Sequence, residues 1–170
     1  GVVMTFASPY FFTPLNIEAL LMGLTVNGVV AVGMVMVIIS GGLDLSVGST
    51  MAFAGVVTGL SLNAGIPVPV AIMIGLAVSI AVGLVNGALV AGLGINPFIT
   101  TLGMMITVRG LLLIFSSGKA VLNLPEAFKV IGQGRLFGLQ YPIYAMVVIV
   151  IVGAFLMRNS RFLRQVYYVG

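Results

Sequence analysis

Histidine and cysteine are absent from this 170-residue chain, which carries only seven Lys or Arg and three Asp or Glu. Without cysteine there is no disulfide framework, thiolate metal site or cysteine nucleophile. Without histidine the commonest general base and metal ligand is missing, and the few carboxylates lie far apart in sequence, which argues against a hydrolytic or metal site. The chain also lacks a phosphate-binding glycine loop that ends in Lys-Ser or Lys-Thr. We therefore expect no enzyme activity, no metal and no cofactor in this chain.

The residues that are present favour a membrane environment. Hydrophobic residues make up 61% of the chain and charged residues 6%, whereas soluble domains carry about a quarter charged residues. A chain this apolar would expose large apolar patches to water, so lipid is the better solvent. We predict an all-α, polytopic membrane protein. Three basic residues gather in the C-terminal tail, which is typical of a cytoplasmic membrane face rather than of nucleic-acid binding; they are Arg158, Arg161 and Arg164.

Five apolar runs divide the chain, and each is compatible with a membrane helix. They lie near residues 17–40, 45–62, 68–93, 98–115 and 139–157, and together predict a transmembrane helix bundle over residues 17–157. Residues 1–16 are expected to form an extracytoplasmic interfacial segment, residues 116–138 an extracytoplasmic loop, and residues 158–170 a cytoplasmic basic tail. The chain begins without Met and has no signal-peptide pattern, so we interpret it as an internal fragment of a longer membrane protein.

The junction between the first two runs contains Gly41, Gly42, Asp44 and Ser46. A carboxylate is costly in hydrocarbon, so Asp44 must lie at a membrane surface, at a helix end or in a cavity lined by protein. It could cap the second helix by accepting backbone N–H bonds, with Ser46 able to do so one register later. It could instead bind a solute hydroxyl or contact a cytoplasmic partner. We favour the cap, because Asp just before an apolar helix is a common start signal. The glycine pair permits positive φ angles and close backbone approach.

The third run carries a small residue at every fourth position. Small residues at this spacing form a groove along a helix that lets another backbone come close. We expect tight packing inside one subunit rather than a subunit interface. The row consists of Ala71, Gly75, Ser79, Gly83, Gly87 and Ala91.

Polar residues inside the apolar runs are the remaining candidates. Arg109 lies about 18 Å along the fourth helix from Pro97; it could line a polar path, lock helices together or extend to the outer surface. Neutral amides and hydroxyls in membrane helices mostly bond to neighbouring helices, yet they also suit an uncharged, hydroxyl-rich solute. The polar residues expected to matter are Asp44, Ser46, Asn86, Asn96, Thr100, Thr101 and Arg109, with Gly41, Gly42 and Pro97 as parts of the surrounding motifs.

Two sequence blocks resemble the signature of bacterial ABC importer permeases for monosaccharides, which are distantly related to branched-chain amino acid permeases. The first runs from Val35 to Ser49, and the second from Val85 to Leu111. A third block, Arg158 to Gly170, resembles the segment that leads to the cytoplasmic coupling region of that family.

The resemblance implies about ten membrane helices in a type II-like importer permease, of which this chain would hold the second to the sixth. It implies a homo- or heterodimer in the bacterial inner membrane, surrounded by lipid, with separate ATP-binding cassette ATPase subunits and an extracytoplasmic solute-binding protein. The expected function is a permease subunit that forms the translocation path for a sugar or similar polar solute.

Two other functions remain open from the residues alone. A secondary transporter or channel without an ATPase would normally need ionisable residues at mid-depth, and only Arg109 qualifies. A non-transporting membrane scaffold would need only the tight small-residue packing.

Overall fold

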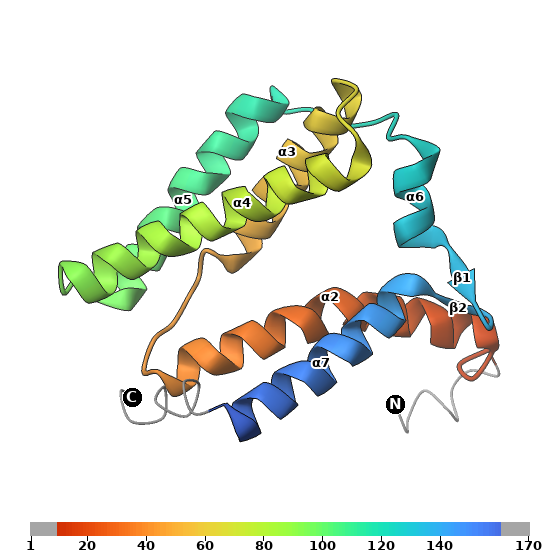
Figure 1. Cartoon of the computed structure of the whole chain (residues 1–170), viewed down its shortest axis with the longest axis horizontal. Coiled ribbons are helices and arrows are strands. Elements are labelled where there is room, and N and C mark those ends of the chain that lie inside the picture. Colours follow the sequence, from red (N-terminus) through yellow and green to blue (C-terminus); the bar gives the residue numbers. More distant parts are fainter. Residues whose placement is uncertain (1–9, 161–170) are drawn as a thin grey trace. The chain divides into compact units, whose positions relative to one another are not determined.

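The computed structural model describes residues 10–160, and most of these are helical. In chain order the elements are α2 (Pro14–Ile39), α3 (Val47–Asn63), α4 (Val68–Gly87), the π-helical turn η1 (Ala88–Gly92), α5 (Pro97–Ser116), α6 (Glu126–Gln133), β1 (Arg135–Leu136), β2 (Leu139–Gln140) and α7 (Tyr141–Asn159) (Figure 1). The predicted all-α class is confirmed.

Within residues 10–160, four helical segments are long and apolar enough to cross a membrane: α2, α4 continued through η1, α5 and α7. Helix α3 is apolar but has only 17 residues, about 25 Å at 1.5 Å per residue. All five apolar runs are therefore helices whose ends lie within a few residues of the predicted ones. That all five cross the bilayer stays a prediction.

The segment predicted as a loop over residues 116–138 contains structure that the sequence analysis did not expect. Helix α6 occupies eight residues of it, and β1 pairs with β2 in an antiparallel hairpin in which Arg135 lies opposite Gln140. The hairpin turns at Phe137 and Gly138, whose φ angles are 48° and 88°. Helix α6 is amphipathic, but its eight residues are fewer than the window of about 11–18 residues over which periodicity is judged, and each strand has only two residues.

The structure divides into two compact units, and the first contains most of α2 together with the hairpin and α7. Helices α2 and α7 approach closely, since a Cβ placed on Gly28 would lie 2.7 Å from the Sδ atom of Met146. Arg135 Nη2 lies 3.1 Å from Glu18 Oε2, so an ion pair ties the hairpin to the beginning of α2.

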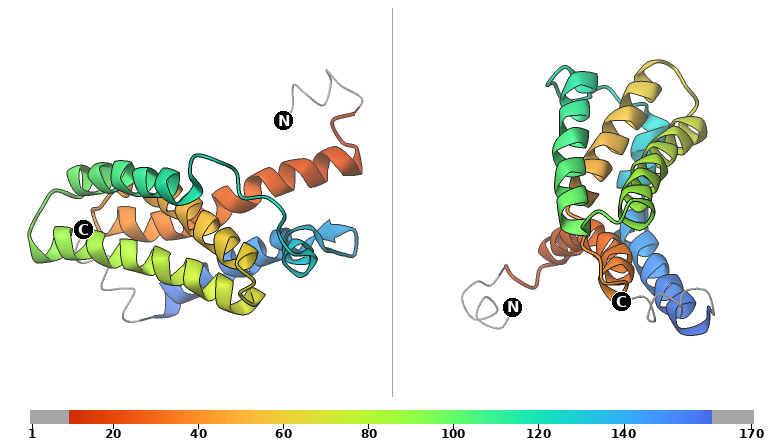
Figure 2. Two further views of the ribbon diagram at one scale, coloured as in Figure 1. Left: turned by 90° about the horizontal axis from the view of Figure 1, so that it is seen from above. Right: turned by 90° about the vertical axis from the view of Figure 1, so that its left-hand side faces the viewer.

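The second unit runs from Val37 to Lys129 and contains α3, α4 and α5. Helix α3 packs against both α4 and α5 (Figure 2). The rings of Phe53 on α3 and Phe115 on α5 meet edge to face with centroids 5.4 Å apart, and Val108 of α5 is fully buried. This three-helix unit carries most of the residues singled out from the sequence.

Candidate functional site

The glycine pair ends α2 in the way its sequence predicts. The N–H of Gly41 donates to the carbonyl of Ile38, and the N–H of Gly42 donates to the carbonyl of Val37, both at 3.0 Å. This is the Schellman pattern of helix termination, which requires a left-handed residue, and Gly41 has a φ of 76°. The chain can therefore leave α2 abruptly and bring Asp44 to the start of α3.

Asp44 and Ser46 form a closed hydrogen-bonded pair before α3. The Oδ1 atom of Asp44 accepts from the backbone N–H of Ser46 at 2.7 Å and from its hydroxyl at 2.6 Å. Asp44 thus binds a backbone N–H two residues ahead, as the capping interpretation expected. However, α3 begins only at Val47, so Ser46 rather than Asp44 occupies the N-cap position, and the Ser46 side chain makes no capping bond. The Ser46 hydroxyl is instead engaged by other side chains.

Asn86 of α4 completes the link between the α3 N-terminus and the neighbouring helix. Its Nδ2 donates to the Ser46 hydroxyl at 2.9 Å. Ser46 is 1% exposed and Asn86 is 7% exposed, and the Oδ1 atom of Asn86 is buried without a hydrogen-bond partner. A buried amide with an unused acceptor is costly unless another group satisfies it.

Helix α5 contributes a second contact to the same junction. The Thr101 hydroxyl lies 3.0 Å from the carbonyl of Leu43 and 2.9 Å from that of Pro97, and its side chain is buried. Pro97 occupies the first helical position, and the Asn96 side chain caps α5 by accepting from the Phe98 N–H at 2.9 Å. The Thr100 hydroxyl is buried and unpartnered.

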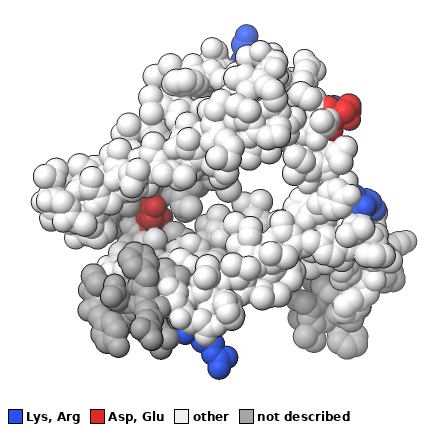
Figure 3. Space-filling view, viewed as in Figure 1, with Lys and Arg blue, Asp and Glu red and all other residues white. Residues whose placement is uncertain are grey.

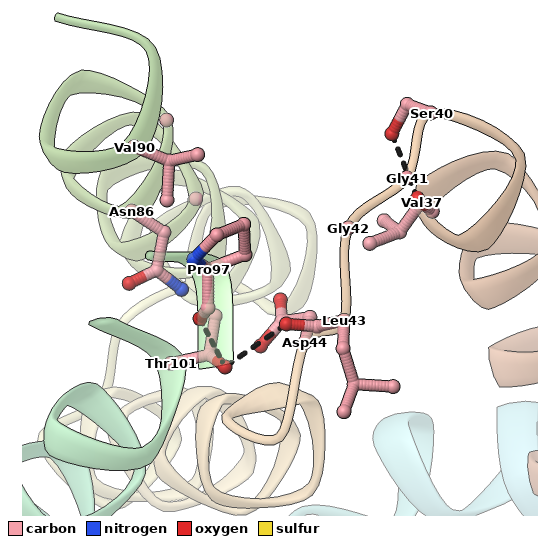
Figure 4. A pocket seen from close by; sticks show the side chains of 12 residues that line it. Val37, Ser40, Gly41, Gly42, Leu43, Asp44, Asn86, Val90, Pro97 and Thr101 are labelled. Carbon is pink, nitrogen blue, oxygen red and sulfur yellow. Dashed lines mark hydrogen bonds between the residues drawn. The ribbon is translucent and has the colours of Figure 1, made fainter. Parts of the chain in front are cut away.

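Asp44, Asn86 and Thr101 line a cavity of about 360 Å³ inside the second unit (Figure 4); Ser46, Asn96 and Thr100 are not among its lining residues. That volume is at the lower end of the range for small-molecule sites. Its wall includes predicted candidates from α4, α5 and the junction, and also backbone and apolar groups that the sequence analysis missed. The lining residues singled out from the sequence are Gly41, Gly42, Asp44, Gly83, Asn86, Gly87, Pro97 and Thr101; those not anticipated are Val37, Ser40, Leu43 and Val90. Their sequence signal was that all four lie within the two blocks that resemble the permease signature.

The row of small residues on α4 has two different environments. Ala71 and Gly75 are buried, and a Cβ added to Gly75 would collide with the Thr58 hydroxyl and lie 3.1 Å from the Ala54 carbonyl oxygen. Tight packing is thus present at that end. A Cβ on Gly83 or on Gly87 would meet nothing within 4 Å, because that end of the row faces the cavity. Ser79 lies between them and bonds its own helix at the Gly75 carbonyl.

Arg109 is not part of the cavity. It lies exposed on α5, and within residues 10–160 it forms no hydrogen bond or ion pair. The face in Figure 3 is almost uncharged, with only isolated acidic and basic groups. The structure therefore brings Asp44, Ser46, Asn86 and Thr101 together and leaves Arg109 apart. Of the basic tail, Arg161 and Arg164 lie outside the described residues, and Arg158 lies in the last turn of α7.

Comparison with known proteins identifies the chain's relatives. The family profile for the branched-chain amino acid transport system / permease component matches residues 16–170. The chain is 42% identical to the L-arabinose ABC transporter permease protein AraH of Azospirillum brasilense, over the whole chain and 53% of that protein. It is 33% identical to the ribose import permease protein RbsC of Escherichia coli K12, over 99% of the chain and 54% of that protein.

A third relative is the fructose import permease protein FruF of Bifidobacterium longum, 40% identical over 83% of the chain and 41% of that protein. No solved structure matches the chain significantly. The chain spans about half the length of the curated relatives it matches. The resemblance to ABC sugar permeases is confirmed by these matches, and the chain belongs to the family of branched-chain amino acid transport system permease components.

Proposed function

We propose that the parent protein is the permease subunit of an ATP-driven importer for a monosaccharide in the bacterial inner membrane. The observation that carries this proposal is the 42% identity, over the whole chain, to a relative named as an L-arabinose ABC transporter permease. Relatives named for ribose and fructose import point to the same solute class. The cavity supports it, because its polar lining is a single carboxylate with neutral amide and hydroxyl groups, which suits an uncharged, hydroxylated solute.

The permease makes and breaks no covalent bond in this proposal. The 170 residues of this chain contain no phosphate-binding glycine loop with a Lys-Ser or Lys-Thr ending, which supports placing ATP hydrolysis on separate ATPase subunits. An extracytoplasmic solute-binding protein delivers the sugar, and a second permease subunit, identical or related, completes the path. Nucleotide binding then shifts the permease between two access states, a population shift driven by the partner subunits.

The candidate residues have distinct roles in this mechanism. Asp44, Asn86 and Thr101 line part of the sugar's path, and Ser46 holds the first two in place. The Schellman end of α2 and the proline start of α5 shape the cavity wall. With the basic residues of the tail on the cytoplasmic side, the α2–α3 junction also lies toward the cytoplasm.

Reconstitution of the full-length parent with its ATPase and binding-protein partners tests the proposal. ATP hydrolysis is measured in proteoliposomes with and without sugar-loaded binding protein, together with uptake of radiolabelled L-arabinose, D-ribose and D-fructose. We expect sugar-loaded binding protein to stimulate hydrolysis and one of these sugars to accumulate only when ATP is present. Unloaded binding protein and liposomes without permease are the controls.

Two results would contradict the proposal. Uptake that follows an ion gradient and needs no ATP would show a secondary transporter. Correct assembly without stimulation or uptake of any tested sugar would favour a membrane scaffold.

A further inference from the structure

The carboxylate of Asp44 has one oxygen fully engaged and one unused. Its Oδ1 atom receives both bonds from Ser46, whereas its Oδ2 atom receives no hydrogen bond from residues 10–160. Neither of the two ion pairs formed in that part of the chain involves Asp44, and the cavity that it lines contains no Lys or Arg. A carboxylate in an apolar surrounding without a cation needs a hydrogen-bond donor from elsewhere.

A second unused acceptor lies next to it. Asn86 is only 7% exposed and lines the same cavity. Its Oδ1 atom receives no hydrogen bond. Both the carboxylate and the Asn86 amide lie within 3 Å of the Ser46 hydroxyl, at 2.6 and 2.9 Å. The two side chains that carry the unused acceptors are thus linked through one hydroxyl, and both line the cavity.

The chemistry of this pair selects the ligand. Its two unused oxygens are acceptors, the Ser46 hydroxyl donates to Asp44, and the Thr101 hydroxyl bonds backbone carbonyls; the second N–H of the Asn86 amide is the donor that remains. A divalent cation would need about six oxygen ligands, and among the described residues no cluster of three His, Cys, Asp or Glu exists. A neutral ligand with adjacent hydroxyl donors satisfies both acceptors, and its hydrogen bonds to the carboxylate are charge-assisted.

We propose that Asp44, supported by Asn86, is a hydroxyl-binding subsite that holds two neighbouring hydroxyls of the transported sugar. This rests on the proposed sugar import and deepens it. Ser46 is a positioning residue: its two bonds to Asp44 fix the carboxylate, and Asn86 fixes Ser46 in turn. These three hydrogen bonds restrain the carboxylate, which lowers the ordering cost of binding.

Asp44→Asn tests the subsite with little change in shape. The Ser46 N–H and hydroxyl can still donate to the amide oxygen, so the new NH₂ group replaces Oδ2 at the cavity and converts an acceptor into a donor. We expect at least a ten-fold loss in uptake of the best sugar among L-arabinose, D-ribose and D-fructose. Uptake is measured in proteoliposomes containing the full-length parent, its ATPase and its binding protein.

Monodeoxy analogues of that sugar provide the specific readout. In the parent, the analogue that lacks the contacted hydroxyl should be transported at least ten-fold less well, because a buried acceptor then stays unpaired. In Asp44→Asn this discrimination should disappear for that analogue alone. For each sugar, the uptake rate of the variant is divided by the uptake rate of the parent. The selectivity of the binding protein is common to both and cancels in this ratio.

Ser46→Ala tests the positioning role, since it removes the hydroxyl bond to the Asp44 carboxylate and keeps the backbone N–H bond. It should weaken the discrimination among deoxy analogues without abolishing it. Arg135→Ala is the control, since it breaks an ion pair of residues that do not line the cavity; it should reduce stability and preserve the discrimination. If Asp44→Asn fails to assemble, Asp44→Glu replaces it; the carboxylate is then displaced by one methylene, and the pattern among analogues should change.

The outcomes are separable. If Asp44→Asn, or Asp44→Glu in its place, lowers uptake of the sugar and of all its analogues equally, the carboxylate has a structural role and the subsite is wrong. Unchanged uptake would overturn it as well. Failure of the unmutated parent to transport any sugar refutes the proposed function instead.

Discussion

Gly75 and Gly83 belong to one row on α4, yet the structure predicts opposite effects when each is changed to alanine. At Gly75 the new methyl group would collide with the Thr58 hydroxyl and lie 3.1 Å from the Ala54 carbonyl. At Gly83 it would meet nothing within 4 Å. Both changes give the same gain in helix propensity, about 1 kcal/mol, so this term cancels when the two variants are compared.

The difference between the variants therefore isolates the overpacking term. Inserting a methyl group into a well-packed contact costs about 1–3 kcal/mol, so Gly75→Ala should be less stable than Gly83→Ala by that amount. The Thr58 side chain can rotate, but the Ala54 carbonyl is part of the α3 backbone and yields less easily. Adding Thr58→Ala to Gly75→Ala should consequently recover part of the loss.

Stability is measured on the full-length parent in detergent, from the free energy of unfolding in an SDS titration followed by circular dichroism. The fraction of protein that stays monodisperse after heating gives a second ranking of the variants by stability. Where unfolding is irreversible, this ranking reflects the rates of unfolding. If Gly75→Ala is as stable as Gly83→Ala, or if Thr58→Ala brings no recovery in the double variant, then α3 and α4 do not pack at Gly75 as described. Transport by Gly83→Ala is not part of this comparison, because Gly83 lines the cavity.

Three further predictions concern local structure, each measured by the same SDS titration. Asn96→Ala should destabilise the protein by about 1 kcal/mol, because the cap bond to the Phe98 N–H is lost, whereas Asn96→Asp should retain it; equal loss in both would contradict the cap. Arg135→Ala leaves the buried Glu18 carboxylate without its cation, so adding Glu18→Gln should restore stability rather than lower it further. Gly41→Ala should cost about 1–2 kcal/mol because φ is 76° there, and Gly41→Asn should cost less; no difference between them would argue against the left-handed turn.

The helices could be predicted from the sequence because their signals are local. Apolar runs as long as the membrane is thick, interrupted at Gly41 and at Pro97, place the helix ends within a few residues of those in the structure. The same local patterns identified Asp44 as a candidate, because a carboxylate between two apolar runs is costly in hydrocarbon and needs a polar environment. They did not find α6 or the hairpin, because eight residues of helix and two residues of each strand are too few for a sequence window to detect.

What the sequence by itself determined was a set of apolar helices, their approximate ends and the residue types at the junctions. The tertiary structure alone decided which of those residues meet. Asn86 reaches Ser46 across 40 positions of the chain and Thr101 reaches Leu43 across 58, while Gly75 is packed against α3 and Gly83 faces a cavity although both follow one spacing. The reason is physical: helix formation depends on neighbours within a turn or two, whereas contacts between helices depend on how side chains far apart in sequence fit together in three dimensions.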